Sequence, residues 1–190
     1  MLTDVTGIRK LELCTLESVE DFLIYTTPEL MEDQCDFIRG WSKAHLSELT
    51  DFTGKIVLDV GAGSGRLTFA AAEKAAWVYA SKPVGTLCGF MREKSVKEGI
   101  NNVRVFDGLV TELPFPDDTF DVVMSGHVVG DDWNGEVEEL TRVCKPGGWL
   151  PDCPGDSERD LAPKPELTSQ GWEEIHYVGS FGKDVYSHRK

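Results

Sequence analysis

The chain has 190 residues, of which 41% are hydrophobic and 27% charged, and it carries a formal net charge of −14 at pH 7. This length suits a single domain, 1–190, with a sizeable core. Affinity for nucleic acid rests largely on neutralising phosphates, so an acidic chain argues against a nucleic-acid partner. No apolar run approaches the roughly 20 residues that cross a membrane, so we expect no membrane partner.

The five cysteines are scattered along the chain and show none of the paired Cys or His spacings of a metal site. We therefore expect no bound metal. Scattered cysteines in odd number are typical of a protein with reduced thiols. No basic segment precedes an apolar run at the N-terminus, so no secretory signal is expected and the predicted location is cytoplasmic.

The first part of the chain predicts helices. Residues 1–15 show no clear period and are expected to form an irregular tail, whereas apolar residues repeat at helical spacing from Leu16 to Leu23. Thr27-Pro28 is typical of a helix start, and a second apolar stripe runs to Thr53-Gly54. We expect two helices over residues 1–53. They either pack on an edge of the core or cap a cofactor and shape the substrate pocket.

The next stretch, residues 57–68, carries the strongest signal. An apolar run ends in Asp59, glycines follow at 61, 63 and 65, and a helical pattern opens at Arg66. Glycines allow a tight turn and a close approach of the backbone to a ligand, and the helix start adds unpaired N–H groups. This order of strand, glycine turn and helix predicts a loop that binds a nucleotide cofactor.

Strands and helices then alternate. Strands are expected near 77–80, 103–106, 120–124 and 149–153. Helices are expected around 87–94 and 133–144, the second opened by Asp131 and Asp132 and stopped by Pro146-Gly147-Gly148. Such alternation predicts parallel strands with right-handed crossovers, within an α/β core spanning 54–190. A polar surface loop over 154–165, a short helix near 166–171 and a hairpin over 172–188 complete the chain.

Three segments occur in a particular order: VLDVGAGSGRLT at 57–68, LPFPDDTFDVV at 113–123 and RVCKPGGWL at 142–150. Together they resemble the class I S-adenosylmethionine-dependent methyltransferases, in particular the type 11-like branch. The resemblance implies a three-layer Rossmann-like fold with a mostly parallel seven-stranded sheet and an antiparallel last strand. It also implies S-adenosyl-L-methionine as cofactor and methyl transfer to an acceptor, for which we expect a small molecule. The expected state is a monomer or homodimer.

Ligands of such sheets bind beyond the carboxyl ends of the strands. By resemblance, the glycine loop holds the methionine part and ribose of the cofactor. Asp107 accepts from the adenine amino group, and the N–H of Gly108 or Leu109 donates to a ring nitrogen. The full set of expected cofactor-binding residues is Asp59, Gly61, Ala62, Gly63, Gly65, Ser81, Lys82, Asp107, Gly108, Leu109, Ser125 and Gly126.

Lys82 departs from the family pattern, which ends the second strand with a ribose-binding carboxylate. An ammonium has three donors and no acceptor, so it cannot replace that carboxylate. Three alternatives remain open. Lys82 points to solvent and Ser81 or water holds the ribose; the chain is a non-catalytic binding or regulatory relative; or it is an NADP-dependent oxidoreductase, in which a basic residue accepts the ribose phosphate.

His127 is the candidate catalytic residue. Methyl transfer needs mainly alignment and exclusion of water, and it needs a base only when the acceptor must lose a proton. The ordinary pKa of histidine suits that task, although the same residue could simply hold the loop in place. Asp152 and Cys153, at the mouth of the fifth strand, are candidates for lining the acceptor site.

Overall fold

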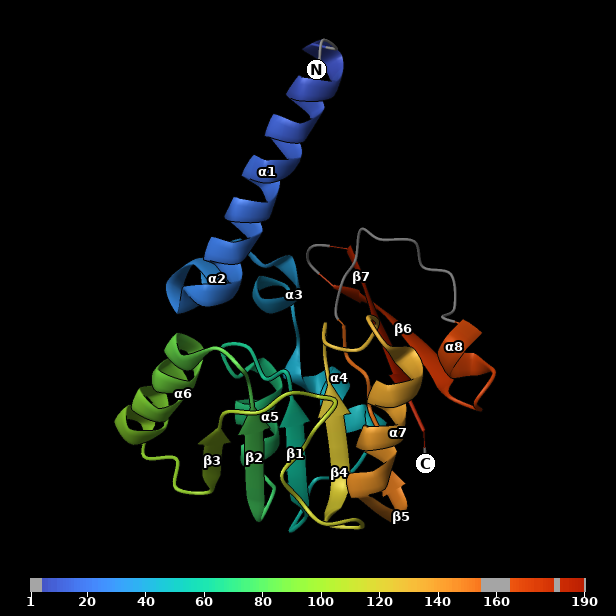
Figure 1. Ribbon diagram of the computed structural model, residues 1–190. Coiled ribbons are helices and arrows are strands. Elements are labelled where there is room, and N and C mark those ends of the chain that lie inside the picture. Colours follow the sequence, from blue (N-terminus) through green and yellow to red (C-terminus); the bar gives the residue numbers. More distant parts are fainter. Residues whose placement is uncertain (1–4, 155–164, 180–181, 190) are drawn as a thin grey trace.

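Five parallel strands form the central sheet of the structure, a computed structural model that describes residues 5–154, 165–179 and 182–189. The strand order is β3-β2-β1-β4-β5 (Figure 1). β1 therefore lies in the middle of the sheet, with β2 and β3 on one side of it and β4 and β5 on the other, so that the strand order reverses between β1 and β4. Ligands of open α/β sheets bind at such a switch point. The strands are β1 (Ile56–Val60), β2 (Trp77–Ser81), β3 (Val103–Phe106), β4 (Phe120–Ser125) and β5 (Cys144–Trp149).

Helices cover both faces of the sheet because side chains alternate between the faces along each strand. Val57 belongs to a core formed with α4 and α5, whereas the next residue, Leu58, belongs to a core formed with α7 and α8. Met91 of α6 packs with Ala80 on the side of α5. These helices are α4 (Lys43–Leu49), α5 (Arg66–Ala72), α6 (Gly85–Glu98), α7 (Trp133–Val143) and α8 (Pro165–Thr168).

An aromatic cluster takes the place of a helix between β3 and β4. Residues 107–119, all of them described, contain no helix. Instead the ring of Phe115 lies 4.8 Å from that of Phe120 and 5.1 Å from that of Phe106, edge to face in both cases. This geometry is favourable for aromatic pairs, so the segment covers its part of the sheet with side chains alone.

The N-terminal part differs from the prediction. The expected irregular tail over residues 1–15 is wrong from Val5 onwards, because Ile8 and Leu11 continue the helical apolar stripe that begins to be obvious only at Leu16. From residue 5 onwards, where the description of the chain begins, four helices precede β1 instead of two. The predicted helix start at Thr27-Pro28 is confirmed. The first three helices are α1 (Val5–Thr26), α2 (Pro28–Gln34) and α3 (Asp36–Arg39).

The placement of these helices matters for the site. α2 and α3 lie above the carboxyl ends of the strands, whereas α1 projects away from the body of the domain (Figure 1). Cys35 has an extended backbone and separates α2 from α3. None of the described helices combines the length and apolar character needed to cross a membrane.

The C-terminal part also differs in detail. β5 begins at Cys144, not near Trp149, because Pro146-Gly147-Gly148 forms an irregularity within the strand instead of preceding it. The predicted hairpin is present as β6 (Glu173–Gly179) and β7 (Gly182–His188), but it forms a two-stranded antiparallel sheet of its own. The predicted loop over 154–165 lies almost wholly outside the described residues.

The expected seven-stranded sheet is therefore a sheet of five parallel strands with a separate pair beside it. The pair meets the larger sheet through reciprocal backbone hydrogen bonds of 2.8 and 3.3 Å between Leu150 and Arg189. Both residues lie just beyond the ends of β5 and β7. The ladder is thus too short to join the two sheets into one.

Candidate cofactor site

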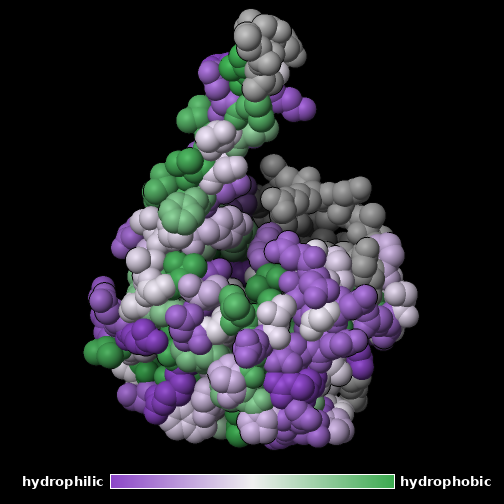
Figure 2. Space-filling model, in the orientation of Figure 1, coloured by the Kyte–Doolittle hydropathy of each residue, from purple (hydrophilic) through white to green (hydrophobic). Residues whose placement is uncertain are grey.

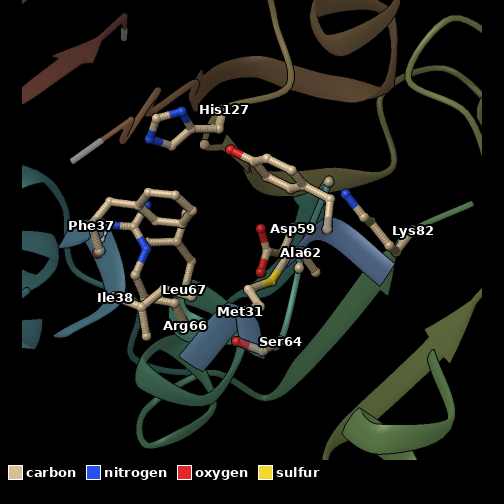
Figure 3. A pocket seen from close by; sticks show the side chains of 14 residues that line it. Met31, Phe37, Ile38, Asp59, Ala62, Ser64, Arg66, Leu67, Lys82 and His127 are labelled. Atoms are coloured by element: carbon tan, nitrogen blue, oxygen red, sulfur yellow. Dashed lines mark hydrogen bonds between the residues drawn. The ribbon is translucent and has the colours of Figure 1, made fainter. Parts of the chain in front are cut away.

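A pocket with about 440 Å³ of empty space lies at the carboxyl ends of β1, β2 and β4, below α2 and α3. Figure 3 shows its lining side chains, with the Asp59 carboxylate among them. The predicted convergence of strand ends is therefore seen for three of the strands. The lining residues are Tyr25, Met31, Phe37, Ile38, Asp59, Gly61, Ala62, Gly63, Ser64, Arg66, Leu67, Lys82, Gly126 and His127.

The glycine loop forms one wall of this pocket. Gly61, Gly63 and Gly65 have φ of 71°, 56° and 96°, a left-handed conformation that other residues adopt at a cost. The loop is tied to β2 by a 3.0 Å hydrogen bond from the Ala62 N–H to the Ser81 carbonyl. The tight turn predicted from the glycine pattern, between β1 and α5, is therefore present in the structure.

Asp59 is the lining residue with the most unusual environment. Its side chain is buried, with a residue exposure of 1%. The Thr68 hydroxyl donates a hydrogen bond to Oδ2, but Oδ1 has no hydrogen-bond partner among the described residues. Burial raises the pKa of Asp59 to about 7, against the opposing effects of Thr68 and of the positive charges of Arg66 and Lys82. A buried acceptor without a partner is costly, so this atom is available for a donor or a cation that enters the pocket.

Lys82 lines the same pocket and is partly buried. Figure 3 shows the Lys82 side chain beside the pocket, and its direction relative to a bound cofactor stays a prediction. Burial lowers the pKa of Lys82, while the negative charges of Cys88 and Asp59 oppose this shift. The position therefore contributes a positive charge where the family pattern has a carboxylate.

Arg66 is a lining residue whose role the sequence pattern did not reveal. Its Nη1 donates to the Phe37 carbonyl at 3.2 Å, and its Nη2 donates to the Cys153 carbonyl. The guanidinium also lies 5.5 Å from the centre of the Phe37 ring and 5.1 Å from that of the Trp41 ring. Contacts of this kind with aromatic faces are favourable. Arg66 thus joins the start of α5 to α3 and to the segment after β5.

His127 lies on the opposite side of the pocket, in the loop that follows β4. Its φ of 56° is uncommon for a residue with a side chain. The imidazole ring lies 4.2 Å from the ring of Phe37, centre to centre, and lines the pocket (Figure 3). The position is compatible with both predicted roles, namely a base that faces a ligand and a residue that holds the loop against α3.

Other predicted residues lie outside the pocket lining. The fully buried Ser81 hydroxyl donates to the Gly108 carbonyl at 2.9 Å and joins the ends of β2 and β3. The Ser125 hydroxyl donates to Asp152 at 2.9 Å. Both serines therefore hold strand ends in place. The remaining predicted residues outside the lining are Gly65, which is buried against Phe69, Gly108, and the exposed Asp107 and Leu109.

The predicted acceptor residues at the end of the fifth strand do not line the pocket. Asp152 and Cys153 are both buried. Burial raises the pKa of the Cys153 thiol well above its ordinary value, so the group is a neutral core side chain. Asp132 begins α7 as predicted, with its carboxylate accepting from the Gly135 N–H at 3.3 Å.

The second and third sequence segments have structural roles. Arg142, from RVCKPGGWL, donates to the carbonyls of Leu113 and Phe115, at 3.2 and 2.8 Å, and to the Asp117 carboxylate at 2.8 Å. All three acceptors belong to LPFPDDTFDVV. The two segments are therefore paired in space by one arginine, away from the pocket.

Comparison with known proteins agrees with this architecture. Residues 57–148 match a family model described as a methyltransferase domain. A demethylmenaquinone methyltransferase of Geobacillus stearothermophilus is 34% identical over 119 residues, which cover 57% of this chain and 48% of that protein. An uncharacterised protein of Mycobacterium bovis is 35% identical over 99 residues, 51% of this chain and 36% of that protein. The chain thus spans about half the length, or less, of these curated relatives.

Solved structures show the same fold. The crystal structure of a SAM-dependent methyltransferase from Aquifex aeolicus has a TM-score of 0.61 and 24% sequence identity, and the match covers 87% of this chain and 91% of that one. The fold and the glycine loop are those of the class I S-adenosylmethionine-dependent methyltransferases, and residues 57–148 match a methyltransferase domain, which indicates S-adenosyl-L-methionine as the cofactor.

Proposed function

We propose that this chain holds S-adenosyl-L-methionine in the pocket above the glycine loop and catalyses transfer of its methyl group to a small-molecule acceptor. The observation that carries the proposal is the buried Asp59 carboxylate, which belongs to the pocket lining and whose Oδ1 has no hydrogen-bond partner among the described residues. Curated relatives named demethylmenaquinone methyltransferase support a small acceptor. Residues 1–53 would act as the cap of the site, through α2 and α3.

The residues present fit this cofactor in most respects. The cofactor carries an ammonium and a sulfonium, and a buried carboxylate stabilises a nearby cation strongly. Gly61 and Gly63 line the pocket without side chains, which admits a ligand close to the backbone. Lys82 is the unfavourable element, because its charge opposes those of the cofactor. Asp59 offsets this charge, since the two side chains line the same pocket.

When bound, the cofactor supplies an electrophilic methyl group. The chain's own contribution is alignment and the exclusion of water, for which the apolar side chains of Met31, Phe37 and Ile38 form a suitable wall. His127 lines the pocket beside Phe37 and can accept a proton from the acceptor at an imidazole nitrogen. Asp107, Gly108 and Leu109 are proposed to hold the adenosine part at the end of β3, while Ser81 holds this segment in place through its hydrogen bond to the Gly108 carbonyl.

Calorimetric titration tests the proposal. The chain is titrated in turn with S-adenosyl-L-methionine, S-adenosyl-L-homocysteine and NADPH. We expect saturable binding of both adenosyl compounds and none of NADPH. Asp59→Asn is expected to lose affinity for both, because both carry the ammonium. Binding of NADPH alone would support the oxidoreductase alternative, and binding of none of the three would support a non-catalytic relative.

A second experiment separates binding from turnover. Wild type and His127→Gln are compared in a methyl-transfer assay that measures formation of S-adenosyl-L-homocysteine with quinol and phenol acceptors. Loss of turnover at unchanged cofactor affinity, with recovery at higher pH where the acceptor ionises by itself, indicates that His127 is a base. A loss that is the same at every pH would instead indicate that His127 holds the loop.

A further inference from the structure

The helix α1 exposes a large amount of apolar side chain. It is 22 residues long and projects from the domain, with its extensive contacts made to α2 at its C-terminal end (Figure 1). Figure 2 shows apolar residues along this projecting helix. Those that form the face considered below are Ile8, Leu11, Leu16, Val19, Phe22 and Leu23, which are 38%, 57%, 63%, 52%, 65% and 48% exposed.

These six residues share one face of the helix, which we call the α1 stripe. At about 3.6 residues per turn the six side chains fall within less than half of the helix circumference, and Glu12 lies on the same face. Thr15 lies within the stripe, near the middle of its length. Leu13, 45% exposed, lies on the opposite side. A single projecting helix with an exposed apolar stripe is weakly stable in water. We therefore expect another surface to cover the stripe.

The charges of α1 indicate the nature of that partner. Arg9, Lys10 and Glu12 lie in the first half of the helix, where Arg9 forms an exposed ion pair with Glu12 at 3.1 Å. Glu17, Glu20 and Asp21 lie in the second half, so the first half has a net charge of +1 and the second of −3. Arg9 and Glu20 are eleven residues apart, about three turns, and so flank the same side of the stripe. An identical helix that runs antiparallel about Thr15 would place Glu20 of each copy level with Lys10 of the other and one residue from Arg9. A parallel copy would place like charges together.

We infer that α1 pairs antiparallel with α1 of a second copy of this chain, with Thr15 at the two-fold axis. Ile8 then lies opposite Phe22 of the second copy, and Leu11 opposite Val19, because the members of each pair are equidistant from Thr15 along the chain. Such an interface is self-complementary, as a two-fold dimer requires. The inference is independent of the proposed function, since it uses only the α1 stripe and its charges.

An anionic lipid surface is the less suitable partner. α1 contains two basic and four acidic residues, a net charge of −2, and the whole chain has a net charge of −14. Helices that lie on membranes are typically rich in Lys and Arg along the polar face, because anionic lipids attract them. The acidic side of α1 would be repelled by such a surface, whereas it complements Arg9 of a second copy.

The mass of the intact chain in solution gives the first test. Light scattering coupled to size-exclusion chromatography, over about a hundredfold dilution series, is expected to show a dimer that dissociates on dilution. Leu11→Glu, within the stripe, is expected to raise the dimer dissociation constant at least tenfold. Leu13→Glu, the same change on the opposite side, is expected to leave it unchanged. A wild-type monomer at every concentration would overturn the inference.

The charge pairs test the antiparallel arrangement. Arg9→Glu and Glu20→Arg are each expected to raise the dissociation constant several-fold, because each creates like charges at two places in the dimer. The double variant carrying both changes restores complementarity and is expected to return close to the wild-type value. Additive weakening in the double variant would contradict the antiparallel pairing.

Disulfide formation tests the position of the axis. Cys14 is exposed and the other four cysteines are buried, so the experiment starts from Cys14→Ser. Thr15→Cys in that background is expected to crosslink to itself, whereas Ile8→Cys is expected to crosslink only when mixed with Phe22→Cys. Self-crosslinking at all three positions would indicate a parallel pair. Cosedimentation of monomeric chain with phosphatidylglycerol vesicles, lost in Leu11→Glu, would assign the stripe to a lipid surface instead.

Discussion

The side chain of Val128 lies against Gly61, so that a Cβ placed on Gly61 would be 2.7 Å from the Val128 Cβ. The loop after β4 therefore packs directly onto the glycine loop. Gly61 has two reasons to be glycine, its φ of 71° and this contact. The two reasons can be separated because another glycine of the chain has only one of them.

Gly54 is that control. Its φ is 70°, nearly the same, but a Cβ there would meet nothing within 4 Å. Gly54→Ala is expected to cost about 1 kcal/mol of unfolding free energy, from the left-handed backbone alone. Gly61→Ala is expected to cost roughly 1–3 kcal/mol more, from overpacking against Val128. Urea unfolding of both variants measures the difference in unfolding free energy. Equal losses of unfolding free energy would show that the loop after β4 moves away from the added methyl group without cost.

The buried carboxylate of Asp59 predicts how stability depends on pH. Its pKa is about 7 in the folded chain, against an ordinary value of 3.8. Between these values the folded chain keeps a proton that the unfolded chain has lost. The contribution of this group to stability is therefore complete below about pH 4, is lost as pH rises, and levels off above about pH 7.

Asp59→Asn removes this dependence and keeps an oxygen that can accept from Thr68. We expect the variant to unfold at a higher temperature than wild type at pH 8, with the gain shrinking as the pH falls towards 4. Thermal unfolding followed by circular dichroism across this range is the measurement. A gain that does not change with pH would mean that Asp59 is already ionised throughout.

Lys82 gives a prediction about cofactor affinity. Lys82→Met removes a positive charge from the pocket and is expected to tighten S-adenosyl-L-methionine binding several-fold, since a like charge near the cofactor is lost. Lys82→Glu also adds an acceptor for the ribose hydroxyls and is expected to tighten it by about tenfold or more. Calorimetry of both variants shows how much of the gain in cofactor affinity comes from removing the positive charge and how much from the new hydrogen bonds to the ribose. Unchanged affinity in both would place the cofactor away from Lys82.

Arg142 predicts a loss of stability without a change in binding. Arg142→Met leaves the carbonyls of Leu113 and Phe115 without this donor and is expected to cost about 2 kcal/mol of unfolding free energy. Arg104→Met is the control, because Arg104 donates only to nearby carbonyls and lies over the Trp77 ring. Cofactor affinity of the folded Arg142 variant is expected to equal that of wild type. Weakened binding would mean that the segment it holds also shapes the pocket.

Local patterns determined most of the fold. The glycine loop, the five strands and the alternation with helices could be predicted because periodicity and turn residues act over a few neighbours. The same reasoning missed the start of α1 at Val5. It also placed β5 too late, because α7 already ends at Val143 and Pro146-Gly147-Gly148 lies inside the strand that follows. Asp59, Gly61, Gly63 and His127, which the sequence singled out at or near strand ends, line the pocket. Their roles in binding and catalysis stay predictions.

Only the tertiary structure decided how the pocket is closed. Arg66 contacts carbonyls 29 and 87 residues away in the chain, and no local pattern encodes such contacts. The direction of Lys82 likewise depends on what surrounds the end of β2. The raised pKa of Asp59 comes from its burial in the folded chain. The sequence by itself thus determined which strand ends meet. Packing between segments distant in the chain decided the protonation of Asp59 and which side chains line the pocket.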